Sequence, residues 1–401
     1  MLICIAGKNS IAVNALRFLI EKEIPIHNLC VCINATDDGL HGWQPSLKKY
    51  AEDFKIPIKT LQELYKIKDL IFLSMEFDKL IKPNKFKSKK LYNIHFSKLP
   101  SYKGMYTSVW PILNGETEMG VTLHIIDHGI DTGNIIDQIV FPLSFGENSY
   151  DLYCKFLNYA FIIFKQNWNN LKTTDLKGEL QAIINSSYYS KDTLDYRNIS
   201  INLNATAYHL QNQIRAFNFR PYQLPKVKGY TISHVKITNE RSSKKPGTLL
   251  NSNNISMTFA TIDYNIILFK DNLDEIICSA KNDNIVFIKE ASKLGYQLDE
   301  KNEKGWTPLM VASYNESYKV FNYLLNCNCN VNAINNNGTS VLMYALTSAS
   351  KTSNLHFINS LLKAGACIKH TDYKGINVIE YAKLYGNKLV ISTLDGFYEN
   401  K

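Results

Sequence analysis

The sequence has no cysteine pattern that would build a disulfide framework or a zinc site. Its eight cysteines include two C-x-C pairs, Cys30/Cys32 and Cys327/Cys329. Neither has a second pair or two histidines placed to complete a tetrahedral site. Cysteines without such spacing are typical of reduced thiols in cytosolic proteins. We therefore expect a cytoplasmic protein, and no cluster of candidate ligands suggests a metal.

Long apolar runs and a secretion signal are also missing. No apolar run reaches eighteen residues, whereas a membrane-spanning helix needs about 20. The chain begins MLICIAG, without the basic residues that open a signal peptide. The complete G-x-G-x-x-G of dinucleotide-binding turns is absent from IAGKNSIAV. A membrane span, export and an NAD site are therefore not expected.

The positive charge is not gathered in one arginine-rich block. Lysine and arginine number 45 against 36 aspartates and glutamates, a formal net charge of +9. Much of the excess comes from scattered lysines, such as Lys85, Lys87, Lys89 and Lys90. A solvated surface explains this balance, and so does a field that attracts anionic substrates such as nucleotide diphosphates. We do not expect nucleic acid as a partner.

The first part of the chain alternates strands with helices. Apolar spacing at residues 11–19 is helical. Buried strands are predicted at four short apolar runs, residues 2–6, 29–33, 70–75 and 92–95. This order predicts an α/β fold with a mainly parallel sheet, in which ligands bind beyond the carboxyl ends of the strands.

The rest of the sequence divides the chain further. Strands at 120–126 and 133–141 flank the turn HGIDTG, and a helix is predicted over 148–170. The polar stretch 171–200 marks a boundary, and a short helix and strands follow it up to residue 270. At 401 residues, two or three domains are the ordinary expectation. We predict a catalytic domain (1–180), a small mixed or β middle segment that builds a dimer and contacts a nucleotide (181–270), and an α-helical domain (271–401).

Three similar segments occupy the last third of the chain. They begin at Gly305, Gly338 and Gly375, so the spacings are 33 and 37 residues. The segment T-P-L-M-V-A, residues 307–312, resembles the start of an ankyrin repeat. Such repeats need capped ends, and residues 272–304 would form the cap. The resemblance implies a C-terminal ankyrin-repeat domain.

Three residues have the chemistry that moves an acyl group onto an amine. Asn93 and His95 lie where a predicted strand ends, and Asp131 lies in the HGIDTG turn. Histidine can transfer protons near neutral pH, and a carboxylate can stabilise its charged form. An amide NH2 can donate to a developing oxyanion. The proposed catalytic roles are general base and acid for His95, electrostatic partner for Asp131, and oxyanion donor for Asn93.

Each of these residues has an ordinary structural explanation, but the joint pattern is specific. The sequence N-x-H-x-S-x-L-P, followed by G-V-T-x-H and D-T-G, resembles the folate-dependent formyltransferases over residues 70–140. The resemblance implies a Rossmann-like catalytic domain and 10-formyltetrahydrofolate as the formyl donor. It also implies that the segment SMEF, residues Ser74, Met75, Glu76 and Phe77, lines the pterin pocket.

The loop KLPSYKGMYTSVWPILNGE, residues 98–116, resembles the sugar N-formyltransferases that act on dTDP-linked amino sugars. By that resemblance, the sugar pocket is shaped by Lys103, Tyr106, Thr107 and Ser108. Arg215 and Arg220 would contact the diphosphate, since guanidinium matches phosphate oxygens. Tyr222 either stacks on the thymine ring or packs at an interface.

The resemblance implies transfer of a formyl group to a dTDP-linked amino-dideoxyhexose, with dTDP-3-amino-3,6-dideoxyglucose as the best match. The product would serve surface polysaccharide biosynthesis, such as the O-antigen of lipopolysaccharide, and the enzyme would be a homodimer. Alternatives are a dTDP-4-amino sugar as acceptor, a formyltetrahydrofolate hydrolase, or an ankyrin interaction protein with an inactive first domain. The intact Asn93, His95 and Asp131 argue against the last alternative.

The ankyrin segment has an aromatic residue where its fold does not require one. Trp306 lies at the predicted hairpin tip, with Tyr314 as a neighbour. These residues could bind a protein, bind a second nucleotide-sugar molecule, or brace the chain internally. We favour the small ligand or the internal brace over a protein partner.

Overall fold

The computed structural model describes residues 1–173 and 176–399, which form two compact units. The first unit comprises residues 1–40, 44–252 and 256–268, and the second comprises residues 41–43, 253–255 and those from 269 onward. The division of the sequence into domains at 1–180, 181–270 and 271–401 stays a prediction. The two units are described separately below.

The larger sheet of the first unit has the strand order β2-β1-β3-β4-β6-β7. Its strands are β1 (Leu2–Gly7), β2 (Leu29–Ile33), β3 (Leu70–Met75), β4 (Lys90–His95), β6 (Glu118–Ile125) and β7 (Ile135–Pro142). The first four pair in parallel, whereas β6 is antiparallel to both β4 and β7. The expected α/β fold is confirmed, with a mixed sheet in which the strands of the HGIDTG hairpin are the antiparallel part.

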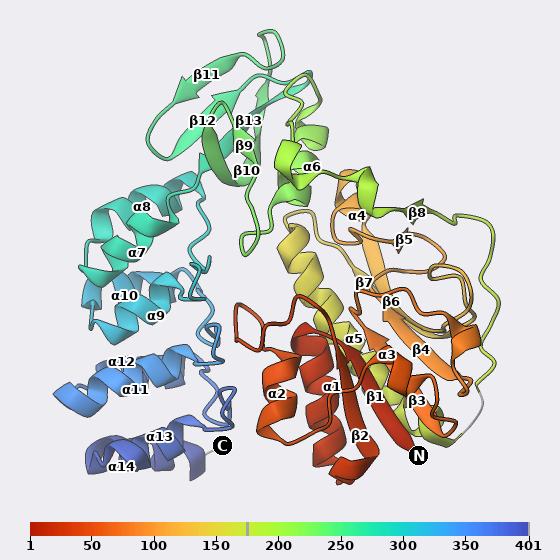
Figure 1. Ribbon diagram of the computed structural model, residues 1–401. Helices are drawn as coiled ribbons and strands as arrows, with labels where there is room; N and C mark the ends of the chain where they lie inside the picture. The colour runs from red at the N-terminus through yellow and green to blue at the C-terminus, as the bar shows by residue number, and fades with distance from the viewer. Residues whose placement is uncertain (174–175, 400–401) are drawn as a thin grey trace. The chain divides into compact units, whose positions relative to one another are not determined.

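Apolar side chains cover both faces of this sheet, because alternate residues of a strand point to opposite faces. Ile3 and Ile5 belong to the core that helices α1 (Asn9–Glu21) and α5 (Ser149–Thr173) cover. Phe18 of α1 packs edge-on against Phe161 and Phe164 of α5, and Figure 1 shows the two helices side by side. The other face carries a smaller core that includes Cys4 and Phe72. Burial on both faces explains why these strands appear in the sequence as continuous apolar runs.

Shorter elements connect the strands of the first unit. They are α2 (Leu47–Asp53), α3 (Leu61–Leu64), α4 (Trp110–Leu113), β5 (Lys103–Gly104), β8 (Tyr188–Tyr189) and the 3-10 helices η1 (Ile26–Asn28), η2 (Pro83–Lys85), η3 (Lys191–Thr193) and η4 (Tyr196–Asn198). The strands β5 and β8 pair with each other in parallel. This small ladder joins the loop after His95 to the segment after α5.

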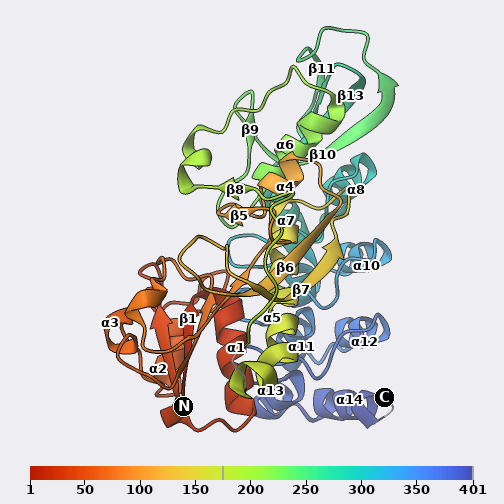
Figure 2. The same cartoon turned by 90° about the vertical axis from the view of Figure 1, so that its right-hand side faces the viewer.

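A second, smaller sheet follows in the same unit. Its strand order is β11-β12-β13-β10-β9, and one helix precedes it. The elements are α6 (Ala207–Phe217), β9 (Lys226–Val227), β10 (Tyr230–Arg241), β11 (Leu249–Ser252), β12 (Ser256–Phe259) and β13 (Tyr264–Lys270). Leu210 and Ile214 of α6 pack on Met257, Phe259 and Leu268 of the sheet in a core of its own. Figure 2 shows this sheet from the side.

The second unit is a succession of paired helices. They are α7 (Leu273–Lys281), α8 (Ile285–Leu294), α9 (Pro308–Tyr314), α10 (Tyr318–Asn326), α11 (Val341–Thr352), α12 (His356–Lys363), α13 (Val378–Tyr385) and α14 (Lys388–Glu399). Gly305, Gly338 and Gly375 have φ values of 76°, 77° and 80°, a conformation that favours glycine. The side chains of Thr307 and Ser340 cap the helices that follow. One turn and one cap, used repeatedly, explain the repeat seen in the sequence.

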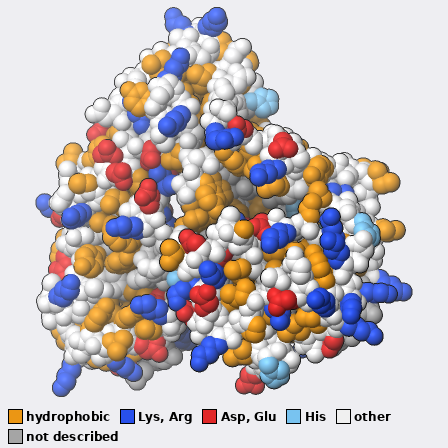
Figure 3. Space-filling model, viewed as in Figure 1, with side chains coloured by type: hydrophobic (Ala, Val, Ile, Leu, Met, Phe, Trp, Pro, Cys, Tyr) orange, Lys and Arg blue, Asp and Glu red, His pale blue; other side chains and the backbone are white. Residues whose placement is uncertain are grey.

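No helix in residues 1–173 and 176–399 is long and apolar enough to cross a membrane. On the face displayed in Figure 3, Lys and Arg side chains are dispersed among acidic and apolar ones.

Candidate active site

The site begins with the register between β4 and β6. Asn93 pairs with His124, and His95 pairs with Thr122. Residues two apart on a strand share a face, and directly opposed residues are close neighbours. Four polar side chains are thereby gathered at one end of β4, where that strand leaves the sheet.

Asp131 supplies the carboxylate at the centre of this group. Its Oδ1 accepts from Asn93 Nδ2 at 3.2 Å, and its Oδ2 accepts from the Gly104 backbone N–H at 2.9 Å. His95 Nδ1 lies 3.4 Å from the same Oδ2. Asp131 itself has a left-handed φ of 54°, which few residues other than glycine adopt. The structure thus brings together all three predicted catalytic residues.

The surroundings of Asp131 keep it ionised. Burial by itself would raise the pKa of this carboxyl group. The attraction of His95, the contact with His124 and, to a smaller extent, the hydrogen bond from the Gly104 N–H together outweigh burial and hold the pKa well below its ordinary value. A carboxylate that stays charged can stabilise an imidazolium beside it.

The hydrogen bonds of His95 determine which ring nitrogen can exchange a proton. Nε2 lies 2.9 Å from the carbonyl oxygen of Tyr102. A carbonyl oxygen only accepts, so Nε2 carries a hydrogen in either charge state of the ring. The proton that His95 gains or loses is therefore the one on Nδ1, beside Asp131. This arrangement is suited to taking a proton from an amine.

His124 belongs to this group and was not among the residues singled out from the sequence. Its side chain is buried, its Nε2 lies 3.0 Å from Asn93 Nδ2, and the same Nε2 lies 3.5 Å from Asp131 Oδ1. The sequence does contain a signal for it, the histidine of G-V-T-x-H. That histidine could have been recognised only with the register between β4 and β6 in hand.

The segment at residues 177–191 crosses the site. Gln181 Nε2 donates to the carbonyl oxygens of Asp131 and Gly133, both at 2.8 Å. Farther along, the backbone N–H of Lys103 donates to the Ser187 carbonyl at 2.9 Å. The same stretch therefore holds the Asp131 turn at one end and the loop after His95 at the other. From the sequence, this stretch was a polar boundary without a role at the site.

The predicted donor-binding residues Ser74 to Phe77 lie at the carboxyl end of β3. Glu76 is partly buried, with φ at 59°, and its carboxylate accepts from Tyr153 Oη at 2.7 Å and from Asn9 Nδ2 at 3.3 Å. Burial raises the pKa of Glu76 to about 7, although both hydrogen bonds act in the opposite direction. Asn34 Nδ2 also donates to the Glu76 carbonyl at 2.8 Å. Side chains from other segments, Tyr153, Asn9 and Asn34, therefore hold this loop, and its contact with a donor stays a prediction.

The loop after His95 contains the residues predicted to shape a sugar pocket. Lys103 Nζ donates to Ser186 Oγ at 3.1 Å, and Tyr106 Oη donates to the Lys191 carbonyl at 3.0 Å. Thr107 and Ser108 are half-buried just before α4. All four therefore lie in the segment that residues 177–191 hold, and their contact with a sugar stays a prediction.

The residues predicted to contact a nucleotide differ in exposure. Arg215 is 7% exposed, and its guanidinium donates to the carbonyls of Glu147 at 2.7 Å and Ser144 at 3.1 Å and to Asn212 Oδ1 at 3.0 Å. A diphosphate would have to compete with these bonds. Arg220 is half-buried.

Tyr222 is 63% exposed and stacks on Phe219 with ring centroids 5.1 Å apart. Phe219 in turn packs edge-on against Tyr153, the partner of Glu76. An aromatic chain therefore connects the predicted nucleotide segment with the predicted donor loop.

In the second unit, Trp306 is half-buried and Tyr314 is 41% exposed. Both rings pack edge-on against Tyr344, at centroid distances of 6.3 Å and 6.1 Å. The Lys304 ammonium lies 4.9 Å from the Trp306 ring centroid. The structure thus joins the two predicted residues through a third aromatic side chain.

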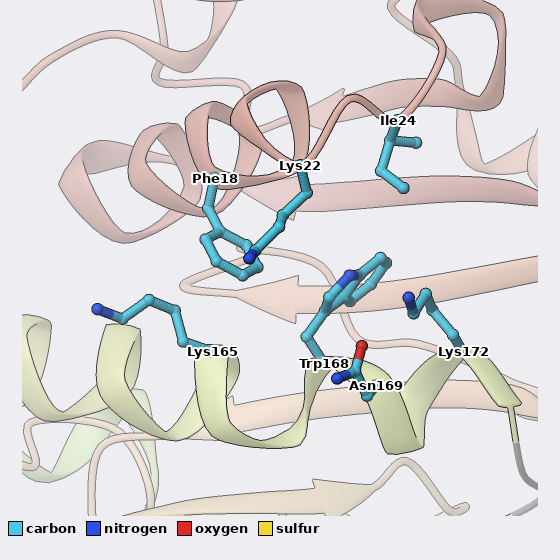
Figure 4. Close-up of a pocket in the computed structure, with 7 residues that line it drawn as sticks. All are labelled: Phe18, Lys22, Ile24, Lys165, Trp168, Asn169 and Lys172. Atoms are coloured by element: carbon cyan, nitrogen blue, oxygen red, sulfur yellow. The ribbon is translucent and has the colours of Figure 1, made fainter.

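A pocket between α1 and α5 is separate from this site. Figure 4 shows its lining, which consists of Phe18, Lys22, Ile24, Lys165, Trp168, Asn169 and Lys172. The nearby Lys90 Nζ donates to the Lys172 carbonyl, so the pocket lies at the start of β4, whereas His95 lies at its end. Both helices end at this pocket. Their terminal carbonyl groups carry partial negative charge, which attracts the lysine side chains and repels an anion.

Within the described residues, no group of three or more His, Cys, Asp or Glu side chains could hold a metal ion.

Comparisons with known proteins assign a class to each part of the chain. Residues 50–166 match the model of the formyl transferase family, and residues 276–392 match a model of three ankyrin repeats. The catalytic fold and the repeats predicted from the sequence are therefore confirmed.

Solved structures are similar over more of the chain. One is an N-formyltransferase from Helicobacter canadensis, solved in complex with folinic acid and dTDP-3-aminofucose, and its sequence is 42% identical to this chain. The match covers 67% of this chain and 100% of that chain, with a TM-score of 0.64. WlaRD, a sugar 3N-formyl transferase solved in the presence of dTDP and 5-N-formyl-THF, is 44% identical, with 68% and 98% covered and a TM-score of 0.64. The chain belongs to the sugar N-formyltransferase family.

Curated relatives match less completely. The bifunctional polymyxin resistance protein ArnA of Wigglesworthia glossinidia brevipalpis is 27% identical over 310 residues, which is 71% of this chain and 45% of that protein. The chain spans about half the length of the curated relatives that it matches, 45% of ArnA and 58% of a methionyl-tRNA formyltransferase of Ureaplasma parvum.

Proposed function

We propose that this protein transfers a formyl group from 10-formyltetrahydrofolate to the amino group of a dTDP-linked 3-amino-3,6-dideoxyhexose. The observation that carries the proposal is the similarity, at 42% and 44% identity, to two N-formyltransferases over nearly their whole length. One of them was solved with folinic acid and dTDP-3-aminofucose, and the other is a sugar 3N-formyl transferase. The glucose-configured dTDP-3-amino-3,6-dideoxyglucose remains our proposed acceptor.

The geometry of the site supports a direct attack by the amine. The ammonium group of the sugar loses a proton to His95 Nδ1, and the Asp131 carboxylate stabilises the imidazolium that forms. The amine nitrogen then bonds to the formyl carbon, while Asn93 donates to the oxyanion. The attacking nitrogen then gives its second proton to solvent, the bond from the formyl carbon to the folate nitrogen breaks, and the folate nitrogen receives the proton from His95. One sugar ammonium and one formyl folate thus give a neutral formamide, the deformylated folate and one released proton, without a covalent enzyme intermediate.

The binding roles belong to the same proposal. Ser74 to Phe77 line the site for the donor, and Lys103, Tyr106, Thr107 and Ser108 shape the sugar pocket. The half-buried Arg220 and the exposed Tyr222 serve the diphosphate and the thymine ring. Arg215 supports them, because it holds the loop carbonyls of Ser144 and Glu147. Homodimer formation and a role in surface polysaccharide biosynthesis complete the proposal.

We also propose that the ankyrin repeats bind a second nucleotide-sugar molecule. The cluster of Trp306, Tyr314 and Tyr344 supports this, since aromatic faces can stack on a nucleobase. Lys304 adds a positive charge beside the ring, which suits a diphosphate.

The test is a formyl-transfer assay with purified protein and 10-formyltetrahydrofolate. The acceptors are dTDP-3-amino-3,6-dideoxyglucose, its galactose-configured epimer and a dTDP-4-amino isomer, and the products are read by mass spectrometry. We expect one formyl group on a 3-amino sugar. Formylation of the 4-amino isomer alone would reject the 3-amino assignment. Consumption of the donor without an amine would indicate a hydrolase, and an intact donor with every acceptor would reject the transferase.

A further inference from the structure

Two histidines lie beside the Asp131 carboxylate, and their hydrogen bonds assign them opposite tautomers. His124 Nδ1 lies 2.8 Å from the carbonyl oxygen of Ile125, so this nitrogen carries a hydrogen. In His95, by contrast, Nε2 is the ring nitrogen that bonds to a carbonyl oxygen, that of Tyr102. Neutral His124 therefore presents a lone pair at Nε2, whereas His95 keeps Nδ1 for proton exchange. The two rings have the same chemistry but cannot have the same role.

The lone pair of His124 has a clear recipient. Asn93 Nδ2 lies 3.0 Å from His124 Nε2 and 3.2 Å from Asp131 Oδ1. A carboxamide nitrogen has two hydrogens, and these two acceptors use both of them. Rotating the amide by half a turn would place its oxygen against the Asp131 carboxylate, which is repulsive. The positions of the amide nitrogen and oxygen of Asn93 therefore follow from its neighbours.

We infer that His124 is a positioning residue that acts on the reaction through Asn93. This inference rests on the proposed formyl transfer, in which Asn93 donates to the oxyanion. The charged Asp131 forms the stronger of the two hydrogen bonds to Asn93, so the neutral His124 forms the one that an oxyanion can displace or share. His124 holds the Asn93 carboxamide in place before the reaction. A donor that is already oriented stabilises the developing oxyanion without having to reorganise during the reaction.

The first test is a double-mutant cycle of four proteins, with His124→Gln as a fifth protein beside it. His124→Phe keeps an aromatic ring of similar volume but removes the acceptor, and we expect kcat to fall roughly tenfold with both KM values unchanged. His124→Gln retains an acceptor and should recover most of the loss. In an Asn93→Ala background, His124→Phe should cost nothing further, because residues that act through one another are not additive. Equal losses in both backgrounds would overturn the inference.

A control separates positioning from stability. Leu123 precedes His124 in β6 and is fully buried in the apolar core. Leu123→Val should lower the melting temperature by an amount comparable to His124→Phe while leaving kcat unchanged. If kcat falls with the melting temperature in this variant as well, His124 has only a structural role.

The second test does not depend on activity. Proton–nitrogen correlation spectra of histidine-labelled protein, with His124 assigned by the His124→Gln variant, report the tautomer directly. We expect a hydrogen on Nδ1 and none on Nε2 at neutral pH. A hydrogen on Nε2 would overturn the inference even in an active enzyme. If the wild-type protein transfers no formyl group but the tautomer is as expected, the proposed function fails and the geometry stands.

Discussion

Gln181 lies 50 residues beyond Asp131 in the chain, yet its Nε2 atom donates a hydrogen bond of 2.8 Å to the Asp131 carbonyl oxygen. The same atom donates to the Gly133 carbonyl, also at 2.8 Å. Asp131 adopts a left-handed backbone conformation, which costs a residue with a side chain roughly 1–2 kcal/mol. The two bonds help to hold the turn in that conformation. The orientation of the Asp131 carboxylate therefore depends on a residue outside the hairpin.

The first prediction concerns Gln181→Leu. Loss of two hydrogen bonds to the turn should let Asp131 move away from His95, so we expect kcat to fall roughly tenfold, the equivalent of about 1.4 kcal/mol. Steady-state kinetics of formyl transfer provide the measurement. The neighbouring Leu180→Ser is the matched control, because the Leu180 side chain is 87% exposed. A Gln181→Leu enzyme as fast as the control would contradict the positioning role.

The second prediction concerns the residues proposed as catalytic. His95→Asn removes the group that we propose takes the proton, and Asp131→Asn removes the charge that we propose stabilises the resulting imidazolium. General acid–base catalysis contributes about 10²–10⁴-fold, so we expect losses of that order in kcat. Binding of dTDP, measured by calorimetry, should change little because neither side chain is proposed to contact the nucleotide. Near wild-type turnover in either variant would reject the assigned roles.

The third prediction follows from the raised pKa of Glu76, about 7 in the folded protein against an ordinary 4.5. Between these values the folded state binds a proton that the unfolded state has lost. Stability should therefore fall as pH rises from about 4.5 through 7, and this contribution should be fully lost above that range. Glu76→Gln lacks this pH-dependent contribution. The melting temperature of the variant minus that of the wild type should therefore increase from pH 5 to pH 8.

Tyr153 offers an independent check of the same pair. Its hydroxyl donates to the Glu76 carboxylate at 2.7 Å, which favours the ionised form. Tyr153→Phe should raise the pKa of Glu76 further and move the pH-dependent loss of stability upward. A melting-temperature difference between Glu76→Gln and the wild type that is the same at both pH values would show that Glu76 does not titrate in this range.

Much of this fold could be predicted from local patterns. The apolar runs gave the strands of the sheet because burial on both faces leaves no polar positions in them. The repeats could be recognised because each uses the same glycine turn. Asn93 and His95 could be placed on one strand face from their spacing, and Asp131 in a turn from the residues around it.

The remainder depends on pairing over long distances. His124 joins the site through the register of β4 against β6, which no local pattern fixes. The segment at residues 177–191 holds the site partly by backbone hydrogen bonds, such as that between Lys103 and Ser187, and these leave no trace in side-chain chemistry. Arg215 has the residue type of a phosphate ligand, but its burial against Ser144 and Glu147 depends on how α6 packs.

The last prediction tests the proposed ligand of the ankyrin repeats. Trp306→Ala removes the ring that packs on Tyr344 and lies under Lys304. If a second nucleotide sugar stacks there, the variant should lose one of two binding events in calorimetric titration with the dTDP-amino sugar. Turnover should then respond differently to substrate at high concentration, where the second site fills. Tyr385→Ala is the control, because Tyr385 is an exposed aromatic residue of α13 that takes no part in the cluster. Identical titrations and identical kinetics in the two variants would reject binding of a second ligand at this cluster. An internal brace would then be favoured, and it should appear as a lower melting temperature for Trp306→Ala alone.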